Sequence, residues 1–129
     1  MASKKIQYTI EKPFRSSPGI LYEFLTSPSA LVLWFADYVD LTEDIYTFGW
    51  NGEMQEAEIL IDIEEDTFRL RWLDDEDEKA FFEFKIRKSE ITNETILFIT
   101  DFAEKEDLKS SKDLWDSQLN DLARVVGAS

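Results

Sequence analysis

The sequence predicts an α+β domain in which a curved antiparallel sheet of about six to seven strands wraps around one long C-terminal helix. Three observations indicate this fold. Residues 39–102 contain one strand-like segment after another, with alternating apolar and polar residues. Within them, Asn51-Gly52 is a strong hairpin signal, because both residues tolerate a positive φ. Residues 107–126 instead carry their apolar side chains on one helical stripe.

A strand and two short helices are predicted before this meander. Residues 6–11 alternate between apolar and polar, which is typical of a half-buried strand. Ser17 followed by Pro18 is a helix start, with serine as the N-cap and proline in the first turn. Ser27-Pro28-Ser29 ends that helix and caps a second short one.

Turns at Asn51-Gly52, at Glu65-Asp66 and through Asp74–Glu78 set three hairpin registers in the predicted meander. The first register pairs Phe48 with Gln55, the second pairs Ile63 with Phe68, and the third pairs Leu70 with Phe82. A slip of one residue in any hairpin would turn a whole strand over. The agreement of the three registers on one apolar face is therefore informative.

These registers divide the strand residues between two faces of the sheet. The inner face receives Tyr46, Phe48, Trp50, Ala57, Ile59, Ile61, Ile63, Phe68, Leu70, Trp72, Phe82, Phe84 and Ile86. The outer face receives Glu58, Asp62, Arg69, Arg71, Glu83 and Lys85. Arg69 lies opposite Glu83, which predicts an exposed ion pair worth less than about 1 kcal/mol.

The predicted C-terminal helix has an apolar stripe that matches the inner face of the sheet. The stripe consists of Leu108, Trp115, Leu119, Leu122 and Val126, widened by Leu114 and Val125. Because a sheet with one apolar face needs a cover, we expect this helix to lie across the concave face. No repeat, linker or low-complexity stretch interrupts the pattern, so residues 1–129 are expected to form a single domain.

The chain is strongly acidic, with 28 acidic and 14 basic residues and a net charge of -14. Such a field opposes docking on nucleic acid or on an anionic membrane. We therefore expect neutral, cationic or apolar partners. The acidic run Asp74–Glu78 is expected to be a solvated loop that could meet a basic protein, since it lacks the spaced ligands of a calcium loop.

The absence of two residue types limits the chemistry. The chain has no cysteine, hence no disulfide, thiolate nucleophile or cysteine-based metal site, and no histidine, the usual general base and metal ligand. No metal or cofactor is expected. The sequence shows no signal-peptide core and no apolar run long enough to span a bilayer, which predicts a cytoplasmic protein. We expect it to be a monomer or a weak dimer.

Five stretches from the second predicted helix onward carry a family resemblance. They are Leu33-Trp34-Phe35-Ala36-Asp37, Tyr46-Thr47-Phe48-Gly49-Trp50, Phe68-Arg69-Leu70-Arg71-Trp72 with its acidic tip, Ile99-Thr100-Asp101-Phe102-Ala103-Glu104 and Leu114-Trp115-Asp116-Ser117-Gln118-Leu119. The chain resembles the START-like superfamily, which shares the helix-grip fold with birch-pollen-allergen-like proteins and polyketide cyclases, and within it a small bacterial family of uncharacterised function.

The resemblance implies a helix-grip fold with an internal cavity between helix and sheet, which in many relatives holds an apolar ligand. It implies no catalytic residue. The chain is more distantly similar to domains like the activator of the heat-shock-protein-90 ATPase. Those domains commonly carry a Gly-Trp pair in the last helix, where Leu114-Trp115 stands here.

The candidate ligand-binding residues are inward aromatic residues and one amide. They are Trp34, Tyr46, Phe48, Trp50, Gln55, Trp72, Phe82, Phe84 and Trp115. The rings can fill a core or line a pocket, and both interpretations stay open. Gln55 is the first candidate for a polar anchor, with Glu53 and Thr100 as further inward candidates. Arginines 69 and 71 are expected to face outward, which argues against a carboxylate ligand.

The leading hypothesis is a non-catalytic binding domain for an apolar or neutral small molecule between the terminal helix and the sheet. The first alternative is an acidic protein-interaction module, similar to a co-chaperone, with a basic partner. The second is a small hydrolase or cyclase, which would require a carboxylate of raised pKa in a cleft. Asp37, Asp40, Glu53 and Asp101 lie near element ends, but nothing in the sequence fixes two at working distance.

Overall fold

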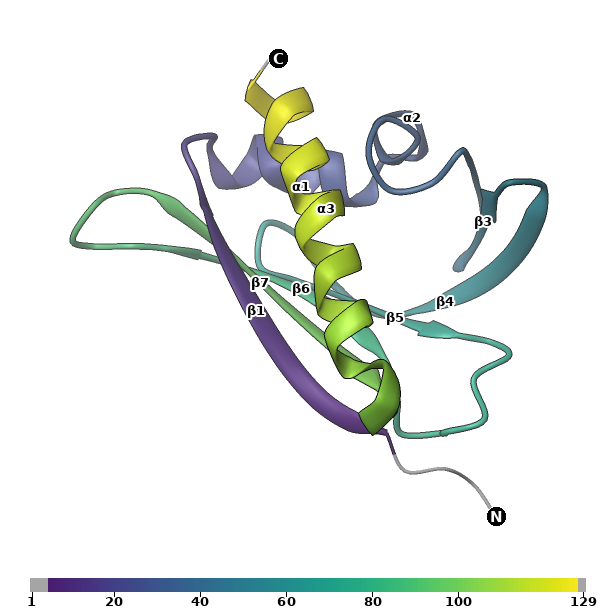
Figure 1. The fold of residues 1–129 in the computed structure, drawn as a ribbon. Coiled ribbons are helices and arrows are strands. Elements are labelled where there is room, and N and C mark those ends of the chain that lie inside the picture. Colours follow the sequence, from purple (N-terminus) through teal and green to yellow (C-terminus); the bar gives the residue numbers. More distant parts are fainter. Residues whose placement is uncertain (1–4, 128–129) are drawn as a thin grey trace.

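A computed structural model describes residues 5–127 as a seven-stranded antiparallel sheet and a long C-terminal helix (Figure 1). The elements are β1 (Ile6–Phe14), α1 (Pro18–Thr26), α2 (Pro28–Leu31), β2 (Tyr38–Thr42), β3 (Ile45–Trp50), β4 (Glu53–Ile63), β5 (Thr67–Trp72), β6 (Phe82–Lys88), β7 (Thr95–Ala103), η1 (Lys105–Asp107) and α3 (Leu108–Gly127). The strand order is β1-β7-β6-β5-β4-β3-β2, and α3 crosses the concave face. This confirms the predicted α+β architecture.

The two short helices begin at the predicted serine and proline positions. The Ser17 hydroxyl accepts a hydrogen bond from the backbone N–H of Ile20 at 3.3 Å, and Pro18 occupies the first turn of α1. Ser27 lies in an extended conformation between the helices, and Pro28 then starts α2. The chain therefore turns twice before it enters β2.

The hairpin between β3 and β4 has the predicted register. Asn51 and Gly52 have φ values of 52° and 86°, and Phe48 pairs with Gln55. The hairpin between β5 and β6 also agrees, because Leu70 pairs with Phe82. These two registers place the aromatic residues of β3, β5 and β6 on one face, under α3.

The predicted register between β4 and β5 is wrong. The turn has three residues, with Glu65 in the left-handed region, so Ile63 pairs with Thr67. A bulge between Ile59 and Ile61 then turns the strand over. Ile61 and Ile63 lie on the outer face instead of the inner one, whereas Asp62 lies on the inner face, opposite Phe68, and accepts a hydrogen bond from Tyr22 of α1.

The core lies between α3 and the concave face of the sheet. Its largest fully buried side chains are Tyr46, Phe48, Phe68, Phe82, Phe84, Leu21, Leu25, Leu31, Leu70, Leu97, Ile99 and Leu122. The helix buries Trp115, Leu119, Leu122 and Val126, but Leu114, predicted to widen the stripe, is 60% exposed. No helix within residues 5–127 has both the length and the apolar character needed to cross a membrane.

The predicted ion pair on the outer face is present but is not exposed. The Arg69 guanidinium lies 2.7 Å from the Glu83 carboxylate, whose side chain is only 4% exposed. The same guanidinium stacks 3.9 Å from the centroid of the Phe81 ring. Phe81 in turn packs on Phe102 of β7. The two arginines of β5 therefore face away from α3, as predicted, and Arg69 covers a buried acid.

We expect Gly52→Ala to lower the free energy of unfolding by about 1–2 kcal/mol, because an alanine side chain disfavours the left-handed backbone. No atom lies within 4 Å of a Cβ built at Gly52, so crowding contributes nothing. Gly127→Ala is the matched control, since that position is equally open and has no positive φ. Urea unfolding would measure both variants, and equal losses would contradict the turn assignment.

Candidate functional site

A cleft of about 700 Å³ opens between α3, the segment that follows α2 and one end of the sheet. Small-molecule sites in proteins usually have volumes of about 300–1,000 Å³. The cleft is open to solvent on one side. The internal cavity implied by the family resemblance is therefore, in this chain, an accessible groove.

Phe35 lies at the centre of the aromatic wall of the cleft. Its ring is 4.9 Å from Phe48, 5.5 Å from Trp50 and 6.0 Å from Trp115, measured between centroids. Such contacts add about 0.5–1.5 kcal/mol per pair beyond simple burial. Phe35 thus joins β3, α3 and the segment after α2. It is not among the nine candidate ligand-binding residues, although it follows Trp34 in the stretch Leu33–Asp37 that carries the family resemblance.

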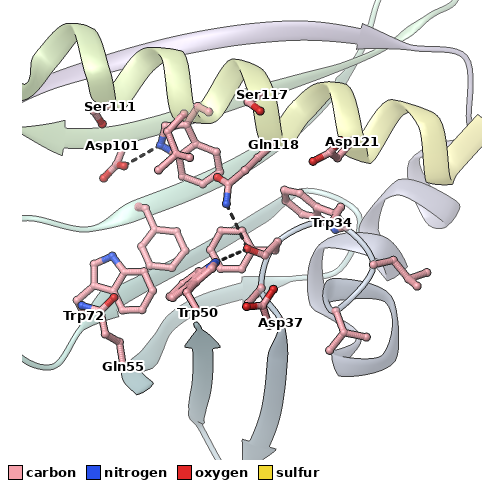
Figure 2. Close-up of a pocket in the computed structure, with 17 residues that line it drawn as sticks. Trp34, Asp37, Trp50, Gln55, Trp72, Asp101, Ser111, Ser117, Gln118 and Asp121 are labelled. Carbon is pink, nitrogen blue, oxygen red and sulfur yellow. Dashed lines mark hydrogen bonds between the residues drawn. The ribbon is translucent and has the colours of Figure 1, made fainter. Parts of the chain in front are cut away.

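Hydrogen bonds to backbone carbonyls fix the orientation of the indoles. The Trp50 indole N–H donates to the Phe35 carbonyl at 2.8 Å, and the Gln118 side-chain amide donates to the same oxygen at 3.2 Å (Figure 2). The Trp34 indole donates to the Phe24 carbonyl of α1 at 2.8 Å. The walls of the cleft are therefore held by bonds within the protein.

Six of the nine candidate residues line the cleft: Trp34, Trp50, Gln55, Trp72, Phe82 and Trp115. The other three, Tyr46, Phe48 and Phe84, are at most 2% exposed and belong to the core. The Tyr46 hydroxyl donates to the Thr26 carbonyl at the end of α1. These three residues support the cleft wall from behind and do not face its space.

The three polar residues predicted to face inward, Gln55, Glu53 and Thr100, lie in different places in the structure. Gln55 is exposed at the end of the cleft beside Trp72 (Figure 2). Glu53 is exposed and does not line the cleft. Thr100 faces outward and not inward, because β7 pairs it with Thr9 on the convex side, where their hydroxyls lie 3.0 Å apart.

Asp101 lies on the cleft lining and is mostly buried against α3. One carboxylate oxygen accepts the Trp115 indole N–H at 2.8 Å, and the other accepts the Phe102 backbone N–H at 2.7 Å. Burial raises the pKa of Asp101, and the hydrogen bonds from Trp115 and Phe102 oppose that shift. The sequence could have placed Asp101 on the inner face, because it stands two residues after the apolar Ile99 and residues two apart in a strand share a face.

A second polar contact joins α3 to the opposite edge of the sheet. The hydroxyls of Tyr8 on β1 and Ser111 on α3 form a hydrogen bond. Burial raises the pKa of Tyr8 to about 12, so its phenol stays protonated at neutral pH. Ser111 also lines the cleft, beside Asp101.

A smaller pocket of about 510 Å³ adjoins the cleft and shares Gln55, Trp72 and Ser111 with it. Its other charged residues are Lys5, Asp74, Asp75, Glu76, Glu104 and Asp107. The loop at 74–78 was predicted to be solvated, but one of its acids is buried. The Asp75 side chain is only 8% exposed, and its carboxylate lies 3.0 Å from the Lys5 ammonium. Within residues 5–127 no group of acids is arranged to hold a metal ion.

Comparison with known proteins agrees with this architecture. A sequence model described as the START-like superfamily domain matches residues 1–128. This chain belongs to the START-like superfamily. Among curated proteins, none matches the sequence.

Several solved structures are similar to this START-like domain. The solution structure of BfR322 from Bacteroides fragilis is 36% identical over 95% of this chain and 91% of that chain, with a TM-score of 0.67. The Aha1 dimer from Colwellia psychrerythraea is 18% identical over 94% and 96% of the two chains, with a TM-score of 0.80. CalU16 from Micromonospora echinospora is 16% identical over 95% and 76%, with a TM-score of 0.75. The last two show the fold alone.

We expect Asp101→Asn to change how stability depends on pH. Because the pKa of Asp101 is raised in the folded protein, the folded state binds its proton at higher pH than the unfolded chain does. The contribution of Asp101 to stability is therefore greatest at low pH and is lost as the pH rises through the folded pKa. The variant should gain stability relative to the wild type over that rise.

Urea unfolding at several pH values would measure this difference, with Asp116→Asn on the exposed face of α3 as the matched control. The indole N–H resonance of Trp115 should report the titration directly in an NMR experiment. A variant whose stability runs parallel to that of the wild type at all pH values would contradict the assignment.

Proposed function

We propose that this START-like domain is a non-catalytic binding module for a small, largely apolar molecule held between α3 and the sheet. The observation that carries the proposal is the accessible cleft with Phe35, Trp50, Trp72 and Trp115 on its lining. Apolar and aromatic walls with a few polar groups are typical of small-molecule sites. The superfamily membership supports the same interpretation.

Burial of apolar surface in the cleft supports only a modest affinity for a small apolar ligand. A ligand that buries about 300 Å² of apolar surface gains about 7 kcal/mol before costs. Association itself costs at least about 4 kcal/mol. Because hydrogen bonds to backbone carbonyls already hold Trp34 and Trp50, little further ordering of the protein is needed. The net gain of about 3 kcal/mol corresponds to a dissociation constant in the millimolar range.

Binding is favoured over catalysis by the environment of Asp101. This acid satisfies one requirement for a hydrolase or cyclase, a raised pKa in a cleft. However, both of its oxygens accept hydrogen bonds from Trp115 and Phe102. That arrangement is typical of an acid that anchors a helix to a sheet, and we assign Asp101 this structural role.

The uncharged fluorescent dye N-phenyl-1-naphthylamine tests the proposal. We expect saturable binding with one dye molecule per chain, and a rise in its fluorescence. Gln55→Phe should weaken this binding at least about fivefold, because the added ring occupies space beside Trp72 that the dye would fill. Titration of the wild type and the variant would measure both affinities.

Gln7→Phe provides the matched control for this experiment. Gln7 is exposed on the outer face of β1, where it pairs with Phe102, so the same substitution there leaves the cleft unchanged. The control should bind the dye as the wild type does. An absence of saturable dye binding, or equal losses in both variants, would overturn the proposal.

A second function is supported by the charge of the surface. The chain carries a net charge of -14, and Asp74, Glu76 and Glu78 are exposed in the loop between β5 and β6. We propose a basic protein as the alternative partner. Its binding should weaken as salt rises from about 20 to about 300 mM, because screening acts over about 10 Å at 0.1 M. Retention of the partner at high salt in a pull-down would contradict this function.

A further inference from the structure

We propose that the ligand of the cleft is an organic cation, in which an apolar body carries an ammonium group. This inference rests on the proposed function, because it names the chemical class of the molecule that the cleft takes. It is argued from the charges that line the cleft, from the pocket that continues it and from the position of Trp72.

Among the described residues 5–127, every charged residue on the cleft lining is an acid: Asp37, Asp101 and Asp121. The remaining polar side chains there are serines and two glutamines. The Gln118 amide N–H is already committed to the Phe35 carbonyl. The indole N–H groups of Trp50 and Trp115 are committed in the same way. The charge that the described cleft lining offers a ligand is therefore negative.

The adjoining pocket strengthens the same field at one end of the cleft. Among the residues that the structure describes, five on its lining are acids and one, Lys5, is basic, and Lys5 pairs with Asp75 at 3.0 Å. Within residues 5–127, Asp74, Glu76 and Glu104 take part in no ion pair. Negative charge without an ion-pair partner among residues 5–127 thus faces the end of an apolar groove.

Trp72 stands where the cleft and the adjoining pocket meet. It lines both, together with Gln55, and its ring stacks on Phe82 at 4.9 Å between centroids. Among aromatic side chains, tryptophan attracts a cation most strongly. An ammonium group beside Trp72 would be within the field of the acids, while its apolar body would lie against Phe35 and Trp50, which line the same cleft. Figure 2 shows Trp50 and Trp72 on the same side of the cleft.

Other ligand charges fit less well. An anion would meet carboxylates in both pockets without a free basic residue among their lining side chains in residues 5–127. A metal ion has no arranged group of acids in the same residues. A neutral molecule gains the apolar contacts alone. The charged lining is used only when the ligand supplies a positive group.

Three soluble probes that share one apolar body test the inference: 4-phenylbutylamine, 4-phenylbutanol and 4-phenylbutyrate. We expect calorimetric titration at pH 7 to show the amine binding about tenfold tighter than the alcohol, because the acids attract its single positive charge in a site that solvent partly screens. The butyrate should bind weakest. Raising the salt from about 20 to about 300 mM should reduce the amine preference.

The double variant Asp74→Asn/Glu104→Gln removes two unpaired acids of the adjoining pocket. It should bring the affinities of the amine and the alcohol to within about threefold of each other, with the alcohol unchanged. The double variant Glu43→Gln/Glu90→Gln removes the same charge from two exposed turns that line neither pocket. This control should keep the full amine preference.

The outcomes separate the two proposals. Equal binding of amine and alcohol, in a protein that still binds N-phenyl-1-naphthylamine, would overturn the cation and leave the binding function standing. Loss of the preference in both double variants would also overturn it, because the effect would then arise from net charge alone. Failure of the uncharged dye itself would remove the binding function.

Discussion

The structure depends on the way in which Trp115 joins α3 to the sheet. Its ring packs on Phe35 and against the edge of Phe84, and its indole N–H reaches Asp101 across the core. A buried indole without an acceptor would lose about 1–3 kcal/mol, so the large ring can occupy the interface only because β7 supplies a carboxylate there. The helix thereby gains a fixed position along the concave face, and the space beside it becomes the cleft.

The same principle governs the other wide rings. Trp34 and Tyr46 donate to carbonyls near the end of α1, where the last turn of a helix leaves acceptors without partners. Trp50 and Gln118 share the Phe35 carbonyl. Each of these hydrogen bonds gives a backbone carbonyl oxygen a donor, and it also holds a side chain that forms or supports a wall of the cleft. A site assembled in this way is already formed before a ligand arrives, which limits the entropy lost on binding.

The alternation in the sequence was sufficient to predict the fold, the terminal helix over the concave face and two of the three registers. Asn51-Gly52 has a turn chemistry that few other dipeptides share, so its register could be assigned. The stretch Ile59-Leu60-Ile61 is apolar throughout, so no polar residue marked the bulge that turns Asp62 inward. The division of the rings between core and cleft depends on how far α3 extends over each strand. Periodicity contains no information on that distance, which is why Phe84 was grouped with Trp72.

The strand order has a consequence for how the chain acquires its shape. β1 hydrogen-bonds only to β7 within the described sheet, and Ile6 there faces Ala103. The segment through Ala103 must therefore be synthesised before β1 can pair with its neighbour β7. Contacts so distant in sequence slow folding, because a long loop must close before they form. Until then the apolar side of β1 is exposed to other proteins, and a chaperone that shields it would be of most use during synthesis.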